Sequence, residues 1–389
     1  MGVTLIVNPG SSSKKFALYK DDVRVLDAYV ESSSDGYNVC TLLKGVQQEC
    51  TTINRRRFHE SLSDFLQKAK ELNLINDLFD IEKVAMRVVA PGTFFQEHKT
   101  LDVGYIQKLK SVEMIAPLHI PHLLKEIEII NKELPHIKLL AISDSAFHST
   151  IPDFIRDYSL PESETKTNDI HRFGYHGLSV ASVIRRIHAV TGTEAERVVV
   201  CHIGSGVSIT AVRGGRSLDN SMGYAPGNGL IMGSRAGDLD IGALLTLMQI
   251  KNMKATDAQN FVQTSGGLKG ITGDNDLRIL LERKVKGDLS ATKAIASFVY
   301  QIQKTIGAYT AVLGGLDLLV FTATAGERSS ILRDLITKNL SGIGVVIDQD
   351  KNEACISKNG VINQMGASIK VAVIKTDETD EIFRITKTL

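Results

Sequence analysis

The sequence has few cysteines, almost no net charge and no long apolar run, and each absence excludes a class of protein. Lys and Arg number 45 against 44 Asp and Glu, so no overall charge draws the chain to nucleic acid or to a membrane surface. No apolar stretch approaches the roughly 20 residues that cross a bilayer, and no signal-peptide pattern is present. We therefore expect a cytoplasmic protein whose partners are small molecules, with no nucleic acid and no membrane among them.

The four cysteines show neither CxxC pairing nor the spacing of metal ligands: Cys40, Cys50, Cys201 and Cys355. Cys201 stands in an apolar segment beside His202. Reduced thiols in a cytoplasmic protein are the expectation from this pattern.

Two segments about half the chain apart, residues 5–30 and 198–223, have the same sequence pattern. Each has an apolar strand, a turn of Gly and Ser, a second strand, a polar turn and a third strand. Such turns leave backbone N–H groups and hydroxyls uncovered, and these arrays bind anions. The first is not a P-loop, because Phe16 to Leu18 continue as a strand where a P-loop opens a helix. The repetition predicts two related domains that bind a nucleotide, for which 389 residues are sufficient.

Strand and helix patterns alternate through the rest of the chain, which predicts an α/β architecture. We expect a turn at 323–327 and a domain boundary near residue 150, because residues 150–168 are rich in Pro, Asp and Ser. Helices are expected at 58–72, 106–113, 121–132, 291–313 and 330–339, and strands at 84–89, 139–142, 318–322 and 370–374.

Polar residues suited to phosphoryl transfer lie where the predicted strands end. In that reaction a protein mainly positions the reactants and neutralises charge around phosphorus, and the planar arginine fork matches phosphate oxygens in pairs. The candidates are Asn8, Ser11, Ser13, Lys15, Arg87, Asp144, His176, Arg235, Asp238 and Glu378.

Each principal candidate also has an ordinary structural interpretation. Arg87 and Arg235 could pair with surface carboxylates, and His176 could be a hydrogen-bonded core histidine. Asp144, in a Ser-Asp-Ser sequence, could cap a helix, and Glu378 could simply be solvated. Their common position after apolar strands favours the functional interpretation.

An ordered series of motifs then resembles the acetokinase family, within the sugar kinase and actin superfamily. The resemblance covers the chain nearly from end to end. The matching stretches are NPGSSSKK at 8–15, RVV at 87–89, APLHIPH at 116–122, SDSAFHSTIP at 143–152, RFGYHGLS at 172–179, CHIGSGVSI at 201–209, LDNSMGYAPGNGLIMGSRAGDLD at 218–240, SGGLKGITG at 265–273 and KTDE at 375–378.

The resemblance implies two duplicated ribonuclease H-like domains of the actin-like ATPase type with a cleft between them. They would comprise residues 1–150, onto which the tail 379–389 packs, and residues 151–378, which carry the nucleotide site. The implied reaction is a direct in-line transfer of phosphoryl between ATP and acetate, giving acetyl phosphate and ADP without a phosphoenzyme. A homodimer is implied as well.

The resemblance also assigns roles to individual residues. Arg87 and Arg235 would bind the phosphoryl group, and His176 would donate a hydrogen bond to it. Mg2+ or Mn2+ would be positioned by Asn8, Asp144 and Glu378. The pocket for the acyl methyl would be lined by Val89, Leu118, Tyr175 and Pro226. The nucleotide would contact Ser11, Ser13, Lys15, His202, Gly204, Ser205, Gly206, Asp276, Leu277, Arg278, Thr324, Ala325, Gly326 and Arg328.

The chain departs from the family pattern at a few of these positions. Ala90 and Pro91 change the loop beside the acyl pocket, and Tyr175 adds a hydroxyl where phenylalanine is common. Thr324 replaces a glycine and Arg328 an asparagine on the adenosine side. Three alternatives therefore stay open: a propionate or other short-chain carboxylate kinase, a pyrophosphate-dependent acetate kinase, and a nucleotide-binding sensor without turnover.

Overall fold

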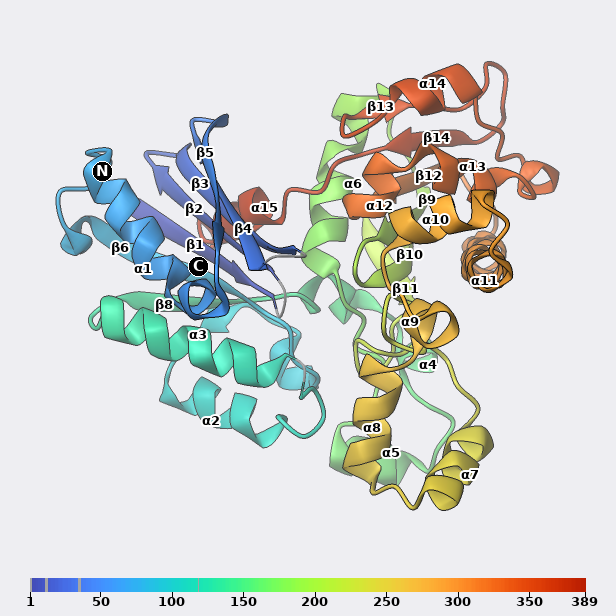
Figure 1. The fold of residues 1–389 in the computed structure, drawn as a ribbon, viewed down its shortest axis with the longest axis horizontal. Helices are drawn as coiled ribbons and strands as arrows, with labels where there is room; N and C mark the ends of the chain where they lie inside the picture. The colour runs from blue at the N-terminus through green and yellow to red at the C-terminus, as the bar shows by residue number, and fades with distance from the viewer. Residues whose placement is uncertain (1, 11–12, 34–35, 118) are drawn as a thin grey trace. The chain divides into compact units, whose positions relative to one another are not determined.

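A computed structural model of the chain describes residues 2–10, 13–33, 36–117 and 119–389 (Figure 1). Residues 1–146 and 377–389 form one compact unit, and residues 147–376 form a second. Each unit contains one β-sheet. Among the described residues, every helix is too short or too polar to cross a lipid bilayer.

Unit 1 is built on an eight-stranded mixed sheet in the order β5-β4-β3-β2-β1-β6-β8-β7. The repeated segment forms the antiparallel run β1–β2–β3, and β1, β6 and β8 are parallel to one another. The strands are β1 Val3–Pro9, β2 Ser13–Lys20, β3 Val23–Ser33, β4 Gly36–Leu43, β5 Val46–Ile53, β6 Ile81–Val88, β7 Lys99–Thr100 and β8 Lys138–Ser143.

Apolar faces of three helices cover one side of this sheet and share its core. They are α1 (Arg55–Glu71), α2 (Val103–Ser111) and α3 (Ile120–Glu133). The terminal helix α15 (Glu378–Ile385) packs against β1, β2 and β6, where Phe383 stacks on Tyr19 at 3.8 Å between ring centroids. Two short 3-10 turns, Leu78–Asp80 and Thr93–Phe95, complete the connections.

Unit 2 has a six-stranded sheet in the order β11-β10-β9-β12-β14-β13. The second repeated segment forms the antiparallel run β9–β10–β11, and β9, β12 and β14 are parallel. Both three-stranded segments expected from the sequence are therefore confirmed. The strands are β9 Arg197–Ile203, β10 Val207–Arg213, β11 Arg216–Asn220, β12 Leu318–Thr322, β13 Gly360–Val361 and β14 Lys370–Val373.

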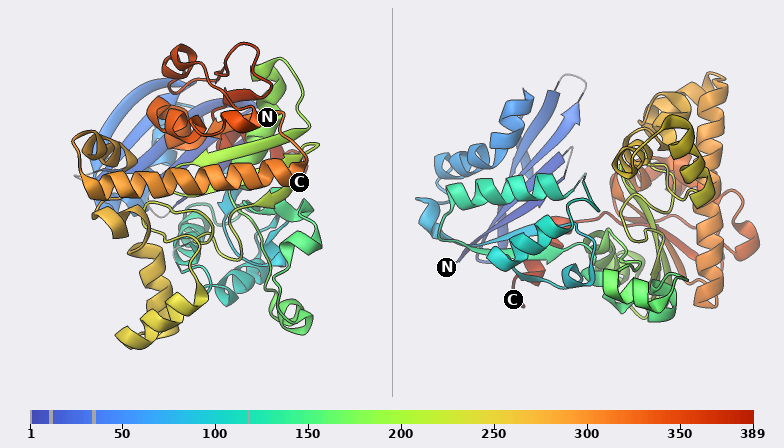
Figure 2. Two further views of the ribbon diagram at one scale, coloured as in Figure 1. Left: turned by 90° about the vertical axis from the view of Figure 1, so that its right-hand side faces the viewer. Right: turned by 90° about the horizontal axis from the view of Figure 1, so that it is seen from below.

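Helix α6 (Gly177–Thr191) shares an apolar core with β9 and β12, and the long helix α11 (Leu289–Leu313) packs against β9 and β10 (Figure 2). The other helices of unit 2 are α4 Asp153–Arg156, α5 Glu162–Asn168, α7 Ile241–Lys251, α8 Ala255–Thr264, α9 Gly267–Thr272, α10 Leu277–Val285, α12 Ala323–Arg328, α13 Ser330–Thr337 and α14 Gln349–Ala354. Further 3-10 turns lie at Ala146–Thr150 and Ser341–Ile343.

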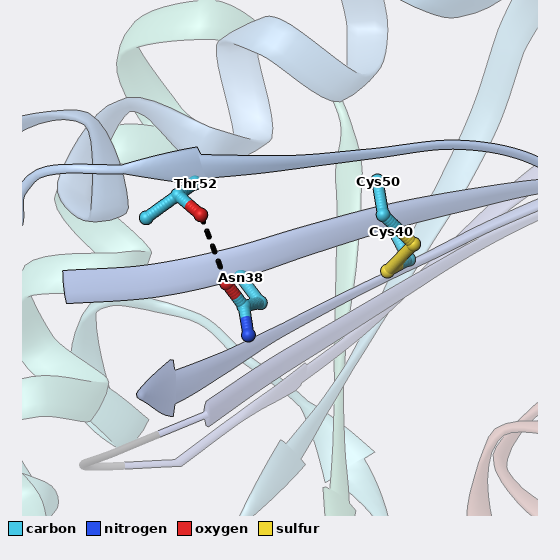
Figure 3. Close-up of a disulfide and its surroundings, with 4 residues drawn as sticks. All are labelled: Asn38, Cys40, Cys50 and Thr52. Carbon is cyan, nitrogen blue, oxygen red and sulfur yellow. Dashed lines mark hydrogen bonds between the residues drawn. A yellow bond between two sulfur atoms is a disulfide. The ribbon is translucent and has the colours of Figure 1, made fainter. Parts of the chain in front are cut away.

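Two expectations from the sequence are wrong. The segment expected as a turn at 323–327 is the short helix α12, in which the buried Glu327 side chain accepts a hydrogen bond from the Ala323 backbone N–H at 2.9 Å. The thiols of Cys40 and Cys50 are not reduced but form a disulfide (Figure 3). These two residues lie opposite each other on the antiparallel strands β4 and β5, where cross-strand side chains are near neighbours. Cys201 and Cys355 are buried free thiols.

Candidate active site

In unit 1, three candidate residues meet at one edge of the sheet. Asn8 lies near the end of β1, Arg87 near the end of β6, and Asp144 directly after β8. These strands are parallel, so their carboxyl ends share an edge, which is where ligands bind in α/β sheets. The Asp144 backbone N–H donates to the Val88 carbonyl at 2.9 Å and so fixes this edge.

The side chains of these residues form one hydrogen-bonded network with Glu378, the first residue of α15. Arg87 donates to Asp144 at 3.0 Å and to the Asn8 amide oxygen at 3.3 Å. Asn8 donates from its amide nitrogen to Glu378 at 2.7 Å, and Arg87 lies 3.6 Å from the same carboxylate. Asp144 is 0% exposed and Glu378 only 10%, so neither carboxylate is an ordinary solvated group.

Arg87 keeps its charge in this setting. Burial disfavours the charged guanidinium, but the carboxylates of Asp144 and Glu378 outweigh it and raise the pKa of Arg87 above its ordinary value. One guanidinium lies between two carboxylates, so the network holds acidic oxygens as well as a charged donor. The network can therefore attract a cation and, through Arg87, still donate to an anion.

The donor chemistry of this network fits Mg2+. That cation prefers oxygen ligands and keeps several waters, and the network offers the oxygens of Asp144, Glu378 and Asn8. Within the described residues, no three of His, Cys, Asp and Glu lie close enough to hold a metal ion by themselves. Water or phosphate oxygens would supply the remaining ligands.

In unit 2, His176 is the N-cap residue of helix α6 and has a left-handed backbone, φ 62° and ψ 25°. Its ring stacks on that of His202, the last but one residue of β9, at 3.9 Å between centroids and 17° between planes. The Nδ1 atom of His176 lies 2.9 Å from the Ser208 hydroxyl, and that of His202 lies 2.8 Å from the Ser179 hydroxyl. His176 is thus hydrogen-bonded, as the structural interpretation expected, but its ring also borders the predicted phosphate turn.

Arg235 and His176 approach the same glycine of that turn. A Cβ placed on Gly206 would lie 2.9 Å from His176 Nε2 and 3.6 Å from Arg235 Nη1. The turn is closed by a 3.0 Å hydrogen bond from the Gly204 N–H to the Gly206 carbonyl. A side chain at residue 206 would therefore occupy the space beside the His176 imidazole and the Arg235 guanidinium.

Arg235 has an environment opposite to that of Arg87. Its Nη1 donates to the Pro226 carbonyl at 2.9 Å, and no carboxylate of the described residues forms an ion pair with it. Burial alone lowers the pKa of Arg235 from its ordinary value. A partly buried guanidinium without a carboxylate is a ready partner for an anion.

The predicted acyl-pocket residues are buried where the structure describes them. Tyr175 is 1% exposed, and its hydroxyl donates to the Tyr224 carbonyl at 2.8 Å, two residues before the buried Pro226. Val89 is buried in unit 1, and Leu118 lies outside the described residues. The hydroxyl that the sequence adds at Tyr175 thus has a backbone partner.

The predicted nucleotide contacts fall on several elements. In unit 1, Lys15 is exposed on β2, opposite Asn8, and Ser13 begins the same strand, whereas Ser11 lies outside the described residues. In unit 2, Ser205 is exposed at the tip of the β9–β10 turn. Thr324, Ala325, Gly326 and Arg328 belong to α12.

Asp276 and Arg278 bond to each other. Asp276 caps α10 by accepting the Arg278 backbone N–H at 2.9 Å, and it also accepts the Arg278 Nε–H at 3.0 Å. Leu277 is the first residue of that helix.

The sequence did not indicate three residues that bond to members of these sites, namely Ser179, Ser208 and Glu327. A buried hydroxyl or carboxylate on a regular element gives no sequence signal until its partner is known.

The two sheets have the actin-like ATPase fold, and the arginine, imidazole and carboxylate groups described above suit a phosphotransferase. A model of the acetokinase family matches residues 3–384. The chain therefore belongs to the acetokinase family.

Known proteins similar over the full length agree with this assignment. The acetate kinase of Sulfurovum sp. (strain NBC37-1) is 31% identical over 390 residues, which is 99% of this chain and 98% of that protein. The crystal structure of Porphyromonas gingivalis acetate kinase matches with a TM-score of 0.85 and 30% identity, covering 100% of this chain and 99% of the other. A propionate kinase from Francisella tularensis matches with a TM-score of 0.86 and 30% identity over 98% of each chain.

Proposed function

We propose that this protein is an acetate kinase that transfers phosphoryl reversibly between ATP and acetate, with Mg2+ bound. The observation that carries the proposal is the position of Arg235 and His176 beside Gly206, because an arginine without a carboxylate and an imidazole there suit a phosphoryl group. The similar acetate kinases support the choice of acetate.

In the proposed reaction, a carboxylate oxygen of acetate attacks the γ-phosphorus of ATP. The new P–O bond forms as the bond to the β–γ bridging oxygen breaks, and ADP leaves with that oxygen. Arg87 and Arg235 bind the equatorial oxygens of the migrating group, and His176 donates a hydrogen bond to it. Bound Mg2+ would neutralise phosphate charge, and Asn8, Asp144 and Glu378 would hold it.

A hydroxylamine trap tests this proposal. Purified protein is incubated with MgATP, pyrophosphate or MgGTP and with acetate, propionate or butyrate, and the acyl phosphate is measured as its hydroxamate. We expect the highest kcat/KM with acetate and ATP, although one methylene discriminates by only about 10- to 200-fold. The proposal would be contradicted if acyl phosphate formed only when pyrophosphate was the phosphoryl donor. It would also be contradicted if none of the three carboxylates gave any acyl phosphate.

Tyr175 is expected to maintain the pocket without selecting the carboxylate. Since its hydroxyl donates to the Tyr224 carbonyl, Tyr175→Phe removes that bond and should lower the free energy of unfolding by about 1 kcal/mol. The ratio of kcat/KM for acetate over propionate should stay within about twofold of the original. A tenfold change in that ratio would instead make the hydroxyl a determinant of specificity.

We also propose that the protein is a homodimer in which a second copy of the chain covers helix α7. This helix carries no charged residue from Ile241 to Ile250 and is mostly apolar there, yet none of its residues is buried. Ile241 is 74% exposed and Leu245 52%, whereas helices that are apolar all round are normally covered. Homodimerisation is also what the motif resemblance implies.

Sedimentation velocity at micromolar concentration tests the dimer. We expect Leu245→Glu to give a monomer, because it places a charge in the proposed interface. The matched control is Val285→Glu on α10, where an apolar residue that is 83% exposed lies outside α7 and the dimer should persist. A monomeric unmodified protein, or a dimeric Leu245→Glu variant, would refute this interface.

A further inference from the structure

Two buried serines are hydrogen-bonded to the stacked imidazoles of His176 and His202, each serine coming from the element next to the other histidine. His176 caps α6 and is bonded by Ser208 of β10, while His202 of β9 is bonded by Ser179 of α6. Ser208 also lies directly opposite His202 in the β9–β10 register. Both serines are 0% exposed, so neither hydroxyl faces solvent.

The choice of nitrogen matters for binding an anion. A neutral imidazole carries one N–H and one acceptor nitrogen, and a hydroxyl that donates to Nδ1 leaves the N–H on Nε2. His176 Nε2 is the atom that approaches Gly206, beside Arg235 Nη1. An Nε2–H there donates to a phosphate oxygen, whereas an unprotonated Nε2 would repel it.

The stacking favours neutral rings. Two imidazolium ions with centroids 3.9 Å apart would repel each other strongly in a buried site. A fixed neutral tautomer gives both rings a donor at Nε2 without requiring two positive charges. The serine hydroxyls are the groups placed to fix it.

We propose that Ser208 and Ser179 are positioning residues that donate to Nδ1 of His176 and His202 and so keep the hydrogen of each ring on Nε2, the tautomer that can donate to a phosphate oxygen. The identity of the phosphoryl ligand rests on the proposed function. The tautomer does not, and it can be observed in the protein without substrate.

Long-range 1H–15N correlation spectra of protein labelled with 15N at histidine test the tautomer directly. We expect the imidazoles of His176 and His202 to have an unprotonated Nδ1 and a protonated Nε2. Ser208→Ala should alter the signals of one of them and Ser179→Ala those of the other. A protonated Nδ1 on both rings, or spectra that neither variant changes, would overturn the proposal.

Kinetics separate positioning from stability. Ser208→Ala should lower kcat about tenfold with the KM for ATP nearly unchanged, and Ser208→Thr, which keeps the hydroxyl, should restore most of it. The control is Thr210→Val, which removes an equally buried hydroxyl from the same strand, one that bonds Asn220 and not the imidazoles. Equal losses of kcat in Ser208→Ala and Thr210→Val would show a merely structural role and overturn the proposal. If the unmodified protein makes no acyl phosphate, the proposed function fails while the spectra still decide the tautomer.

Discussion

Replacing Arg235 with alanine is expected to lower kcat about 1,000-fold, because the variant loses a charged donor to the phosphoryl group in the transition state. No carboxylate of the described residues pairs with this guanidinium, so its removal leaves no buried acid behind and the fold should persist. The Kd for ATP, measured by calorimetry, should change less than about threefold.

The control for this experiment is Arg213→Ala. That guanidinium also belongs to unit 2, but it donates to the carbonyls of Val312 and Leu313 at the end of α11, and turnover should stay within about twofold of the original. Unchanged turnover in Arg235→Ala, with turnover that is normal for the control, would remove Arg235 from the reaction.

Replacing Gly206 with alanine is expected to lower kcat about 100-fold without unfolding the protein. The added Cβ would lie 2.9 Å from His176 Nε2 and 3.0 Å from its Cε1, so the imidazole must move, and displacements near 1 Å can cost about 100-fold in rate. Gly206 does not have a left-handed backbone, so alanine brings no backbone strain and Tm should change little.

A matched glycine shows whether the effect is local. Gly307 lies inside α11 with open space where a Cβ would be, so Gly307→Ala should raise the free energy of unfolding by about 0.5–1 kcal/mol and leave kcat unchanged. If Gly206→Ala retained full activity with a His176 ring signal unaltered, the assigned contact between the turn and the imidazole would be wrong.

The sequence predicted the parts of the fold that depend on local pattern. The three-stranded segments at residues 5–30 and 198–223 are strands in the structure because apolar runs separated by Gly, Ser and polar turns leave few alternatives. Strand β12 has the predicted ends, Leu318 and Thr322. Helix α12 was missed because buried side chains support it: Glu327, within the helix, accepts a hydrogen bond from the Ala323 backbone N–H, and the buried Arg333 donates to the Gly326 carbonyl.

The candidate site shows the same division between local and distant information. Asn8, Arg87 and Asp144 could be expected at one edge because each follows an apolar strand, and the structure brings them together with Glu378. The disulfide could not be expected, because the pairing of Cys40 with Cys50 depends on the register of β4 and β5. Ser179 and Ser208 could not either, since their partners lie 23 and 32 residues away.

The attack of a carboxylate oxygen on phosphorus can be tested most directly with acetate labelled by 18O in both oxygens. With MgATP, we expect the 31P signal of the acetyl phosphate to show the shift of one 18O bonded to phosphorus, and the phosphates of ADP to carry no label. Label in a nucleotide phosphate, or acetyl phosphate without 18O on phosphorus, would contradict it.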